Sequence, residues 1–269
     1  MKSVSEVHGW GRRIGGCILI GGLLVGATSA QAWGRQGHKV VALIAEEKLT
    51  PVAREKTEEI LALENSKTLS DISSWADDVK QTYPYLPSHA VRIPFDADMY
   101  DQERDCSRKR KCIVEAIYMA ERVLKDEKES QRKKLVSLKL LVHYLGDIHQ
   151  PLHAIKQTGQ MNVNLGGRTY KLHKVWDTIS VDFLGHSPEK ISKNILSSGG
   201  TVDRGSPVSW AEESHKIARQ YIYHNDESLA NSSVIYLPKG YLNEISPVIE
   251  QRLYTAGIRL AMEINSIYQ

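Results

Sequence analysis

The chain has 269 residues, of which 41% are hydrophobic and 25% are charged, and its formal net charge is +3 at pH 7. This length suits one domain with a single large core. The nearly balanced charge argues against a general basic surface for nucleic acid, so a polyanionic substrate would have to be held by metal ions in a local site. Nothing in the sequence implies a stable membrane association or a protein partner.

The first 32 residues predict a secretory signal peptide. A pair of arginines precedes an apolar run at positions 14–27, and Ala30-Gln31-Ala32 then supplies a small-x-small cleavage pattern. The apolar run is too short to span a bilayer comfortably. Cleavage after Ala32 would make Trp33 the first residue of a secreted or periplasmic protein. A lipoprotein anchored through Cys17 is the less favoured alternative, because the apolar run would then lie on the wrong side of the cysteine.

The remaining chain predicts mostly helices. Their expected bounds, from apolar periodicity, are 37–49, 51–64, 113–129, 133–149, 173–184, 188–197, 207–224 and 242–267. The segment 83–107 is interrupted by three prolines and predicts a loop. A Gly-Gly pair between two short polar and apolar runs predicts a β-hairpin at 162–171. We therefore expect an all-α fold, namely one mainly helical domain with a single small hairpin.

Eight histidines and aspartates occur at positions that suit zinc, and they are His38, Asp77, His89, His143, Asp147, His153, His173 and Asp177. Two pairs, His143 with Asp147 and His173 with Asp177, are four residues apart in predicted helices, so each pair shares one helix face. A single histidine–aspartate pair at this spacing is more often a surface hydrogen bond. Two pairs, with His153 in the loop between them, predict a multi-metal hydrolase.

Trp33 is a further candidate ligand. Signal cleavage would free its α-amine, and the amine nitrogen and carbonyl oxygen could then chelate one metal ion through a five-membered ring. The alternative is that Trp33 only packs as an aromatic core residue. Its position at the cleavage point, five residues before His38, favours the ligand interpretation.

Cys106 and Cys112 lie close together in a charged loop. In the oxidising compartment that a signal peptide implies, this spacing predicts a local disulfide. Two free thiols are the alternative.

Four motifs together resemble one known family. They are Trp33-Gly-Arg-Gln-Gly-His38, Ser74-Trp-Ala-Asp-Asp78, His143-Tyr-Leu-Gly-Asp147 with the following Ile-His-Gln-Pro-Leu-His153, and Leu172-His-Lys-Val-Trp-Asp177. The chain is similar to the trinuclear-zinc, single-strand-specific nucleases (class I, or mung bean nuclease type), which are related in fold to zinc-dependent phospholipase C. The similarity covers nearly all of residues 33–269, which we expect to be one zinc-dependent nuclease domain.

The resemblance implies three zinc ions. One would be held by Asp77, His89, His143 and Asp147. A second would be held by His153, His173 and Asp177. The third would be held by Trp33, His38 and Asp147. Asp77 would also orient the attacking nucleophile, and Lys80 stands where the family usually has an arginine that contacts phosphate. The implied activity is cleavage of single-stranded DNA and RNA to 5′-phosphorylated products, with 3′-nucleotidase activity as a related reaction.

The residues that would hold the nucleobase depart from the family pattern. An aromatic residue commonly follows the histidine at position 89, but here that residue is Ala90. Arg92 stands where an acidic or amide residue often reads the base, and Asn162 is a remnant of a glycine-rich loop. Arg92, Asn162 and Lys80 are therefore the candidate substrate contacts. Lys80 keeps a positive charge but loses the bidentate geometry of arginine.

Two other functions compete with a nuclease. A zinc-dependent phospholipase C usually ends its ligand set with a glutamate, so Asp177 and the short interval from Trp33 to His38 argue against it. A non-catalytic zinc-binding protein is suggested by the altered nucleobase residues.

Overall fold

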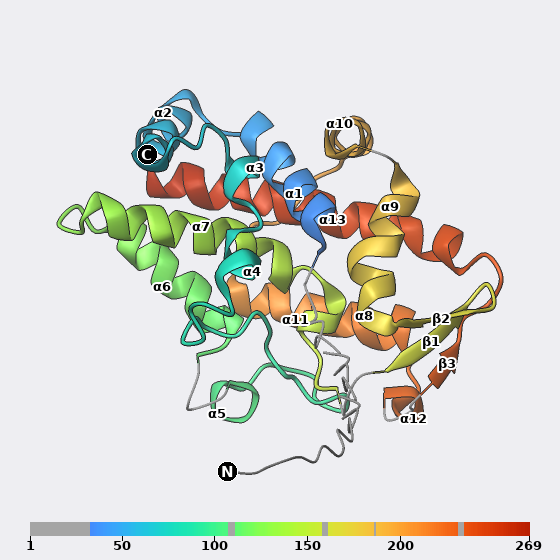
Figure 1. Ribbon diagram of the computed structural model, residues 1–269. Coiled ribbons are helices and arrows are strands. Elements are labelled where there is room, and N and C mark those ends of the chain that lie inside the picture. Colours follow the sequence, from blue (N-terminus) through green and yellow to red (C-terminus); the bar gives the residue numbers. More distant parts are fainter. Residues whose placement is uncertain (1–32, 107–110, 158–160, 186, 231–233) are drawn as a thin grey trace, which may run out of the picture.

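The computed structural model describes residues 33–106, 111–157, 161–185, 187–230 and 234–269. The predicted signal peptide lies outside the described residues. The helices are α1 (Arg35–Glu47), α2 (Pro51–Leu61), α3 (Leu69–Ile72), α4 (Trp75–Val79), α5 (Gln102–Asp105), α6 (Ile113–Lys125), α7 (Gln131–Ile148), α8 (Leu172–Lys174), α9 (Ser180–Leu184), α10 (Pro188–Ser198), α11 (Pro207–Ile217), α12 (Glu227–Ala230) and α13 (Tyr241–Ile267). The strands are β1 (Asn162–Leu165), β2 (Arg168–Lys171) and β3 (Val234–Tyr236). The expected mainly helical fold is confirmed (Figure 1).

The helix ends follow local chemistry. Thr50 caps α2 by accepting a hydrogen bond from the amide of Ala53, and Pro51 supplies the first helical residue. Ser130 caps α7 through the amide of Lys133. Because such caps satisfy amides that have no partner inside the helix, the predicted starts of these two helices lie within two residues of the observed ones.

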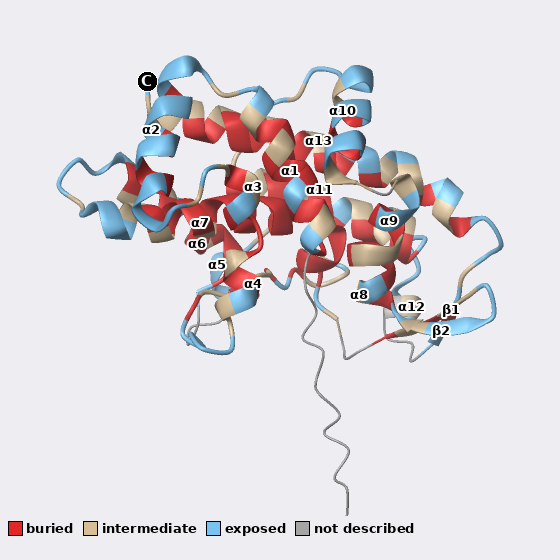
Figure 2. Ribbon diagram, turned by 45° about the horizontal axis from the view of Figure 1, so that its top comes forward, coloured by how far each residue is buried: buried red, intermediate tan, exposed pale blue. Residues whose placement is uncertain are grey.

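Helix α7 runs through the middle of the molecule. It packs against α6 and α13, and α1 packs against α13 (Figure 1). A Cβ on Gly257 of α13 would lie 2.4 Å from the side chain of Ile44, so a glycine is required where α1 and α13 meet. Figure 2 shows α7 as buried over most of its length. A helix surrounded in this way can hold polar side chains away from water.

The predicted β-hairpin is present, but it belongs to a larger sheet. Strands β1 and β2 pair antiparallel, and β3 adds to the other side of β1 in parallel, with Val163 opposite Ile235. Strand β3 was not expected from the sequence, because it has only three residues and pairs with a strand about 70 positions earlier.

Two predicted helices are less regular than expected. The prediction of one α-helix over 173–184 is wrong, because a π-helical segment, Val175–Ile179, separates α8 from α9. A second π-helical segment, Ala218–Ile222, follows α11. The wider π turn leaves the apolar spacing nearly helical, so periodicity does not reveal it. The short helices α3, α4 and α5 were not predicted either, and α5 lies in the segment expected to be a loop.

Within the described ranges, none of the helices combines the length and the apolar character that crossing a membrane requires.

Candidate metal centre

The fold brings the eight predicted histidine and aspartate ligands into two adjoining clusters. The first, here called the α7 cluster, contains His38 of α1, Asp77 of α4, His89 of a loop, and His143 and Asp147 of α7. The second, here called the α8 cluster, contains His153, His173 and Asp177. The two adjoin, because Nδ1 of His153 donates a 2.7 Å hydrogen bond to the carbonyl oxygen of His89.

Distances in the α7 cluster suit zinc. Nδ1 of His89 lies 2.9 Å from Oδ2 of Asp147 and 3.8 Å from Oδ1 of Asp77. Nε2 of His143 lies 3.2 Å from Oδ2 of Asp147 and 4.0 Å from Oδ2 of Asp77. Two ligand atoms about 2.0–2.2 Å from one tetrahedral zinc lie roughly 3.4 Å apart. The observed separations bracket that value.

The α8 cluster shows the same spacing. Nδ1 of His173 lies 3.4 Å from Oδ2 of Asp177, four residues further along the chain. The imidazole rings of His153 and His173 are edge to face, with centroids 5.5 Å apart. The π-helical segment Val175–Ile179 carries Asp177.

Buried polar atoms without protein partners test whether a cation fits. Among the described residues, the buried side-chain atoms without a hydrogen-bond partner include Nδ1 and Nε2 of His38, Nε2 of His89, Oδ1 of Asp147, Nε2 of His153 and Nδ1 of His173. Nε2 of His38 and Oδ1 of Asp147 are 3.1 Å apart without hydrogen-bond geometry, as two atoms would be if both pointed at a third. Unpaired buried polar atoms are costly, so their concentration here fits a site built for cations.

Hydrogen bonds outside the clusters fix the imidazole tautomers. Nδ1 of His143 donates to the carbonyl oxygen of Ser73 at 2.8 Å, as Nδ1 of His153 does to that of His89. In the third case, Nε2 of His173 lies 3.1 Å from Oε1 of Gln157, which accepts its hydrogen. A nitrogen that donates leaves the other ring nitrogen with a lone pair, and in each case that nitrogen faces its cluster.

The charge states depend on burial and on neighbouring charges. Burial raises the pKa of Asp177 well above its usual range. Burial, helped by the charge of Arg92, lowers the pKa of His173 to about 4. Burial also lowers the pKa of His153. The α8 cluster therefore holds neutral imidazoles, which are the form that binds metal, around a carboxylate whose ionisation a cation would favour.

Trp33, the remaining predicted ligand, packs beside His38 and α7. Its side chain is fully buried, and the amide of the next residue, Gly34, donates a 2.7 Å hydrogen bond to the carbonyl oxygen of Asp177. A Cβ on Gly146 of α7 would lie 2.9 Å from Nδ1 of His38 and 3.7 Å from Cδ1 of Trp33. Gly146 thus lets Trp33 and His38 approach α7 directly beside Asp147.

The three predicted substrate contacts, Lys80, Arg92 and Asn162, lie on different elements and differ in burial. Nζ of Lys80 lies 3.0 Å from Oδ1 of Asp77, at the edge of the α7 cluster. Arg92 is exposed and close enough to His173 to affect its pKa. Asn162 is half-buried at the start of β1, paired with Lys171 just before α8. All three therefore remain candidates.

Two glutamines that the sequence did not single out contact the α8 cluster. Gln150 is fully buried, and its amide nitrogen donates to Oδ1 of Asp177. Gln157 accepts from His173, while its own amide donates to the hydroxyl of Tyr223 at 3.3 Å. Neither residue shows a ligand spacing in the sequence. In the sequence, Gln150 is marked only by its position three residues before the proposed ligand His153.

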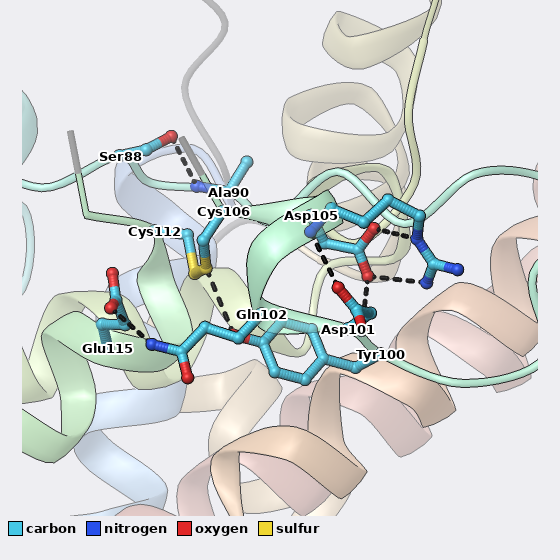
Figure 3. The surroundings of a disulfide bond; sticks show 10 residues. Ser88, Ala90, Tyr100, Asp101, Gln102, Asp105, Cys106, Cys112 and Glu115 are labelled. Atoms are coloured by element: carbon cyan, nitrogen blue, oxygen red, sulfur yellow. Dashed lines mark hydrogen bonds and ion pairs between the residues drawn. A yellow bond between two sulfur atoms is a disulfide. The ribbon is translucent and has the colours of Figure 1, made fainter. Parts of the chain in front are cut away.

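The predicted disulfide between Cys106 and Cys112 is confirmed, with Cα atoms 5.1 Å apart (Figure 3). The amide of Ser88 donates a 2.8 Å hydrogen bond to the carbonyl oxygen of Lys111. The disulfide loop is therefore tied to the segment that leads into His89.

Comparison with known proteins assigns the chain to a family. The S1/P1 Nuclease family profile matches residues 33–269. The chain belongs to the S1/P1 nuclease family. It is 30% identical to Endonuclease 2 of Arabidopsis thaliana, an alignment that covers 91% of this chain and 94% of the plant protein. It is 28% identical to Nuclease S1 of Aspergillus oryzae, with 87% and 91% covered, and 28% identical to Nuclease P1 of Penicillium citrinum, with 88% and 98% covered.

Membership confirms the expected enzyme class. This S1/P1 nuclease is a phosphodiester hydrolase of a zinc-dependent family, and nucleic acid is its class of substrate.

Proposed function

We propose that the protein is an endonuclease that binds three zinc ions and cleaves single-stranded DNA and RNA to 5′-phosphorylated products, with 3′-nucleotidase activity on nucleotides. The observation that carries the proposal is the convergence of buried imidazoles and carboxylates, several of which have an atom without a hydrogen-bond partner, from elements that include α1, α4, α7 and α8. When bound, zinc would lower the pKa of bound water to about 7 and stabilise charge on a phosphate.

The proposed ligand sets follow the two clusters. In the α7 cluster, one ion is held by Asp77, His89, His143 and Asp147, and another by His38, Asp147 and the amine and carbonyl of Trp33. In the α8 cluster, one ion is held by His153, His173 and Asp177. Geometry supports the side-chain members of these sets, because ligand atoms lie within 4.8 Å of one another in three groups: Asp77 with His89 and His143, His38 with His143 and Asp147, and His153 with His173 and Asp177.

The chain's own residues supply orientation and charge. Asp77 holds one carboxylate oxygen toward His89 and the same oxygen against the ammonium group of Lys80. We assign Asp77 the orientation of the attacking water and Lys80 the binding of a phosphate oxygen. Because Lys80 lies at the rim of the cluster, its ammonium can turn from Asp77 to an incoming phosphate without leaving the site.

The proposed third ion links activity to secretion. Only cleavage after Ala32 gives Trp33 a free α-amine, so we propose that the enzyme completes its site when the signal peptide is removed. A variant that retains one extra residue before Trp33 should bind one zinc ion less tightly. Equal affinity for three ions in both proteins would contradict this part of the proposal.

The test of the function is a digest by the processed enzyme. Single-stranded DNA, RNA and 3′-AMP are incubated with and without a chelator, and the products are separated by size and end group. We expect 5′-phosphorylated fragments and chelator-sensitive cleavage. Release of phosphocholine from lecithin without nucleic-acid cleavage would instead support a phospholipase C. Zinc binding without hydrolysis of any phosphodiester would support a non-catalytic protein.

A further inference from the structure

Two exposed tyrosines lie in the segment between Asp77 and His89, two residues of the α7 cluster. Tyr83 and Tyr85 are 40% and 74% exposed, and their rings meet edge to face with centroids 5.7 Å apart. Among the ring pairs formed by the described residues, this is the one in which both rings are exposed. Stable exposure of two aromatic rings in contact is a feature of binding surfaces more than of an ordinary surface.

The segment that carries these rings is fixed at both ends by proposed zinc ligands. It begins after Asp77 of α4 and ends at His89. Tyr144 of α7 donates a 3.0 Å hydrogen bond to the carbonyl oxygen of Pro87, and the amide of Leu86 donates to the carbonyl oxygen of Tyr83 at 3.1 Å. The tyrosines therefore occupy a short turn whose position relative to the metal centre is set by the fold.

The backbone places Tyr83 close to the phosphate-binding edge. The amide of Tyr83 donates to the carbonyl oxygen of Val79 at 2.8 Å, so the chain continues a helical turn beyond α4. At the helical rise, Tyr83 lies about 9 Å along the axis from Asp77. Lys80 and Tyr83 are three residues apart on this turn, a spacing that makes side chains neighbours.

We propose that Tyr83 and Tyr85 form a stacking platform for unpaired bases next to the scissile phosphate. An edge-to-face pair leaves both faces of one ring and one face of the other free of its partner, and free ring faces are what successive bases of a single strand stack on. Ala90, which follows His89, has no ring to offer. The platform would hold bases of a strand whose phosphate is bound by Lys80 and the metal centre.

A single strand is the occupant that the surroundings favour. The platform adjoins the ammonium group of Lys80 and a centre built for cations, both of which attract a polyanion. A duplex keeps its bases stacked on one another, so exposed rings would add affinity only for unpaired bases. This inference rests on the proposed nuclease function and adds the residues that select the strand state.

The experiment compares Tyr83→Ala, Tyr85→Ala and the double variant with Tyr236→Ala in the zinc-loaded, processed enzyme. Tyr236 is the matched control, because it is 80% exposed on β3. Binding of a labelled oligothymidylate is measured by fluorescence anisotropy under conditions that stop cleavage. The ratio of kcat/KM for the oligonucleotide to that for bis(4-nitrophenyl) phosphate is measured in parallel.

We expect the double variant to bind the oligonucleotide about tenfold more weakly and to lose about tenfold in that ratio, whereas Tyr236→Ala matches the parent. Replacing both residues by phenylalanine should restore binding, because stacking needs the ring and not the hydroxyl. An oligonucleotide of abasic sites should bind the parent and the double variant equally.

Equal oligonucleotide binding by the parent and the double variant would overturn the platform, as would an equal loss on the abasic strand. The same loss for Tyr236→Ala would also overturn it. A parent that binds the oligonucleotide through the tyrosines but cleaves no nucleic acid would refute the nuclease function and leave the platform in place. If the parent binds no oligonucleotide but binds vesicles or another protein through the tyrosines, the proposed stacking platform is refuted.

Discussion

Two buried polar clusters lie next to each other around α7, and they differ in how their atoms are satisfied. In the metal centre, both ring nitrogens of His38, Nε2 of His153 and Nδ1 of His173 have no hydrogen-bond partner among the described residues. In the second cluster, here called the arginine cluster, Nδ1 of His149 donates to the carbonyl oxygen of Leu145 at 2.8 Å. Nε2 of His149 accepts a 3.1 Å hydrogen bond from the guanidinium group of Arg259.

The arginine cluster is complete without any ion. It consists of His149, Glu213, Ser214, Arg252 and Arg259. Burial and the two arginines lower the pKa of His149 well below its usual range, so this histidine stays neutral and structural. His149 lies only four residues before His153, so proximity in sequence does not separate ligands from packing residues. Hydrogen bonding to the protein separates these two histidines, because both ring nitrogens of His149 have a partner and Nε2 of His153 has none.

The largest effect should follow loss of Asp77. We expect Asp77→Asn to lower the activity on single-stranded DNA by at least about a thousandfold, because a site that stabilises charge on phosphate contributes several kcal/mol. Asp78→Asn is the matched control, since Asp78 is the next residue and pairs with Arg35 at the surface. Steady-state kinetics and circular dichroism would measure both variants. An active, folded Asp77→Asn enzyme would refute the role of Asp77.

A substitution in the arginine cluster should lower the free energy of unfolding and leave the zinc content unchanged. Glu213→Gln leaves the buried guanidinium groups of Arg252 and Arg259 without a carboxylate, which should cost about 2 kcal/mol of unfolding free energy. Burial opposes ionisation of Glu213, but Arg259 and Arg252 outweigh it and lower its pKa. The stabilisation is therefore present above the usual glutamate pKa and lost as the pH falls, so the gap between variant and parent should narrow in acid.

Urea unfolding at several pH values, together with zinc analysis, would check this prediction. Glu250→Gln, on the exposed side of α13, serves as the control. A loss of zinc from Glu213→Gln without a loss of stability would remove the distinction between the two clusters.

A smaller effect is expected from the glutamine that orients His173. Gln157→Leu removes the acceptor for Nε2 of His173, which should weaken the α8 cluster's affinity for zinc about tenfold. Tyr223→Phe removes only the hydroxyl that fixes the Gln157 amide and should give a weaker change in the same direction. Competition with a chromogenic chelator would measure affinity, and the spectrum of the cobalt-substituted protein would report ligand geometry. An unchanged affinity and spectrum in Gln157→Leu would show that His173 needs no such support.

The smallest effect concerns a carboxyl outside both clusters. Burial and the nearby charge of Glu263 raise the pKa of Glu121 to about 7. The folded state then holds a proton that the unfolded state releases, so stability falls as the pH rises from the usual glutamate pKa toward 7. Glu121→Gln should therefore raise the melting temperature by a few degrees at most at pH 8, and less at pH 5. The exposed Glu127→Gln should show no such pH dependence.

The eight histidines and aspartates that the structure gathers into two clusters could be picked out from the sequence because part of their chemistry is local. His143 and Asp147 share a helix face whatever the tertiary structure, and the residue types themselves favour zinc. The sequence did not reveal β3, the π-helical segments or the role of Gln157. These features depend on contacts between distant segments or on a change of pitch that leaves the apolar pattern intact. The Tyr83–Tyr85 pair also required the structure, because exposure cannot be read from residue type.

The most direct test of the central claim is the metal content of the enzyme processed at Trp33. Elemental analysis of the purified protein, combined with anomalous scattering at the zinc edge, would count the ions and locate them. The account predicts three zinc ions per chain, two in the α7 cluster and one between His153, His173 and Asp177. A single ion, or ions bound away from Asp147 and Asp177, would contradict it.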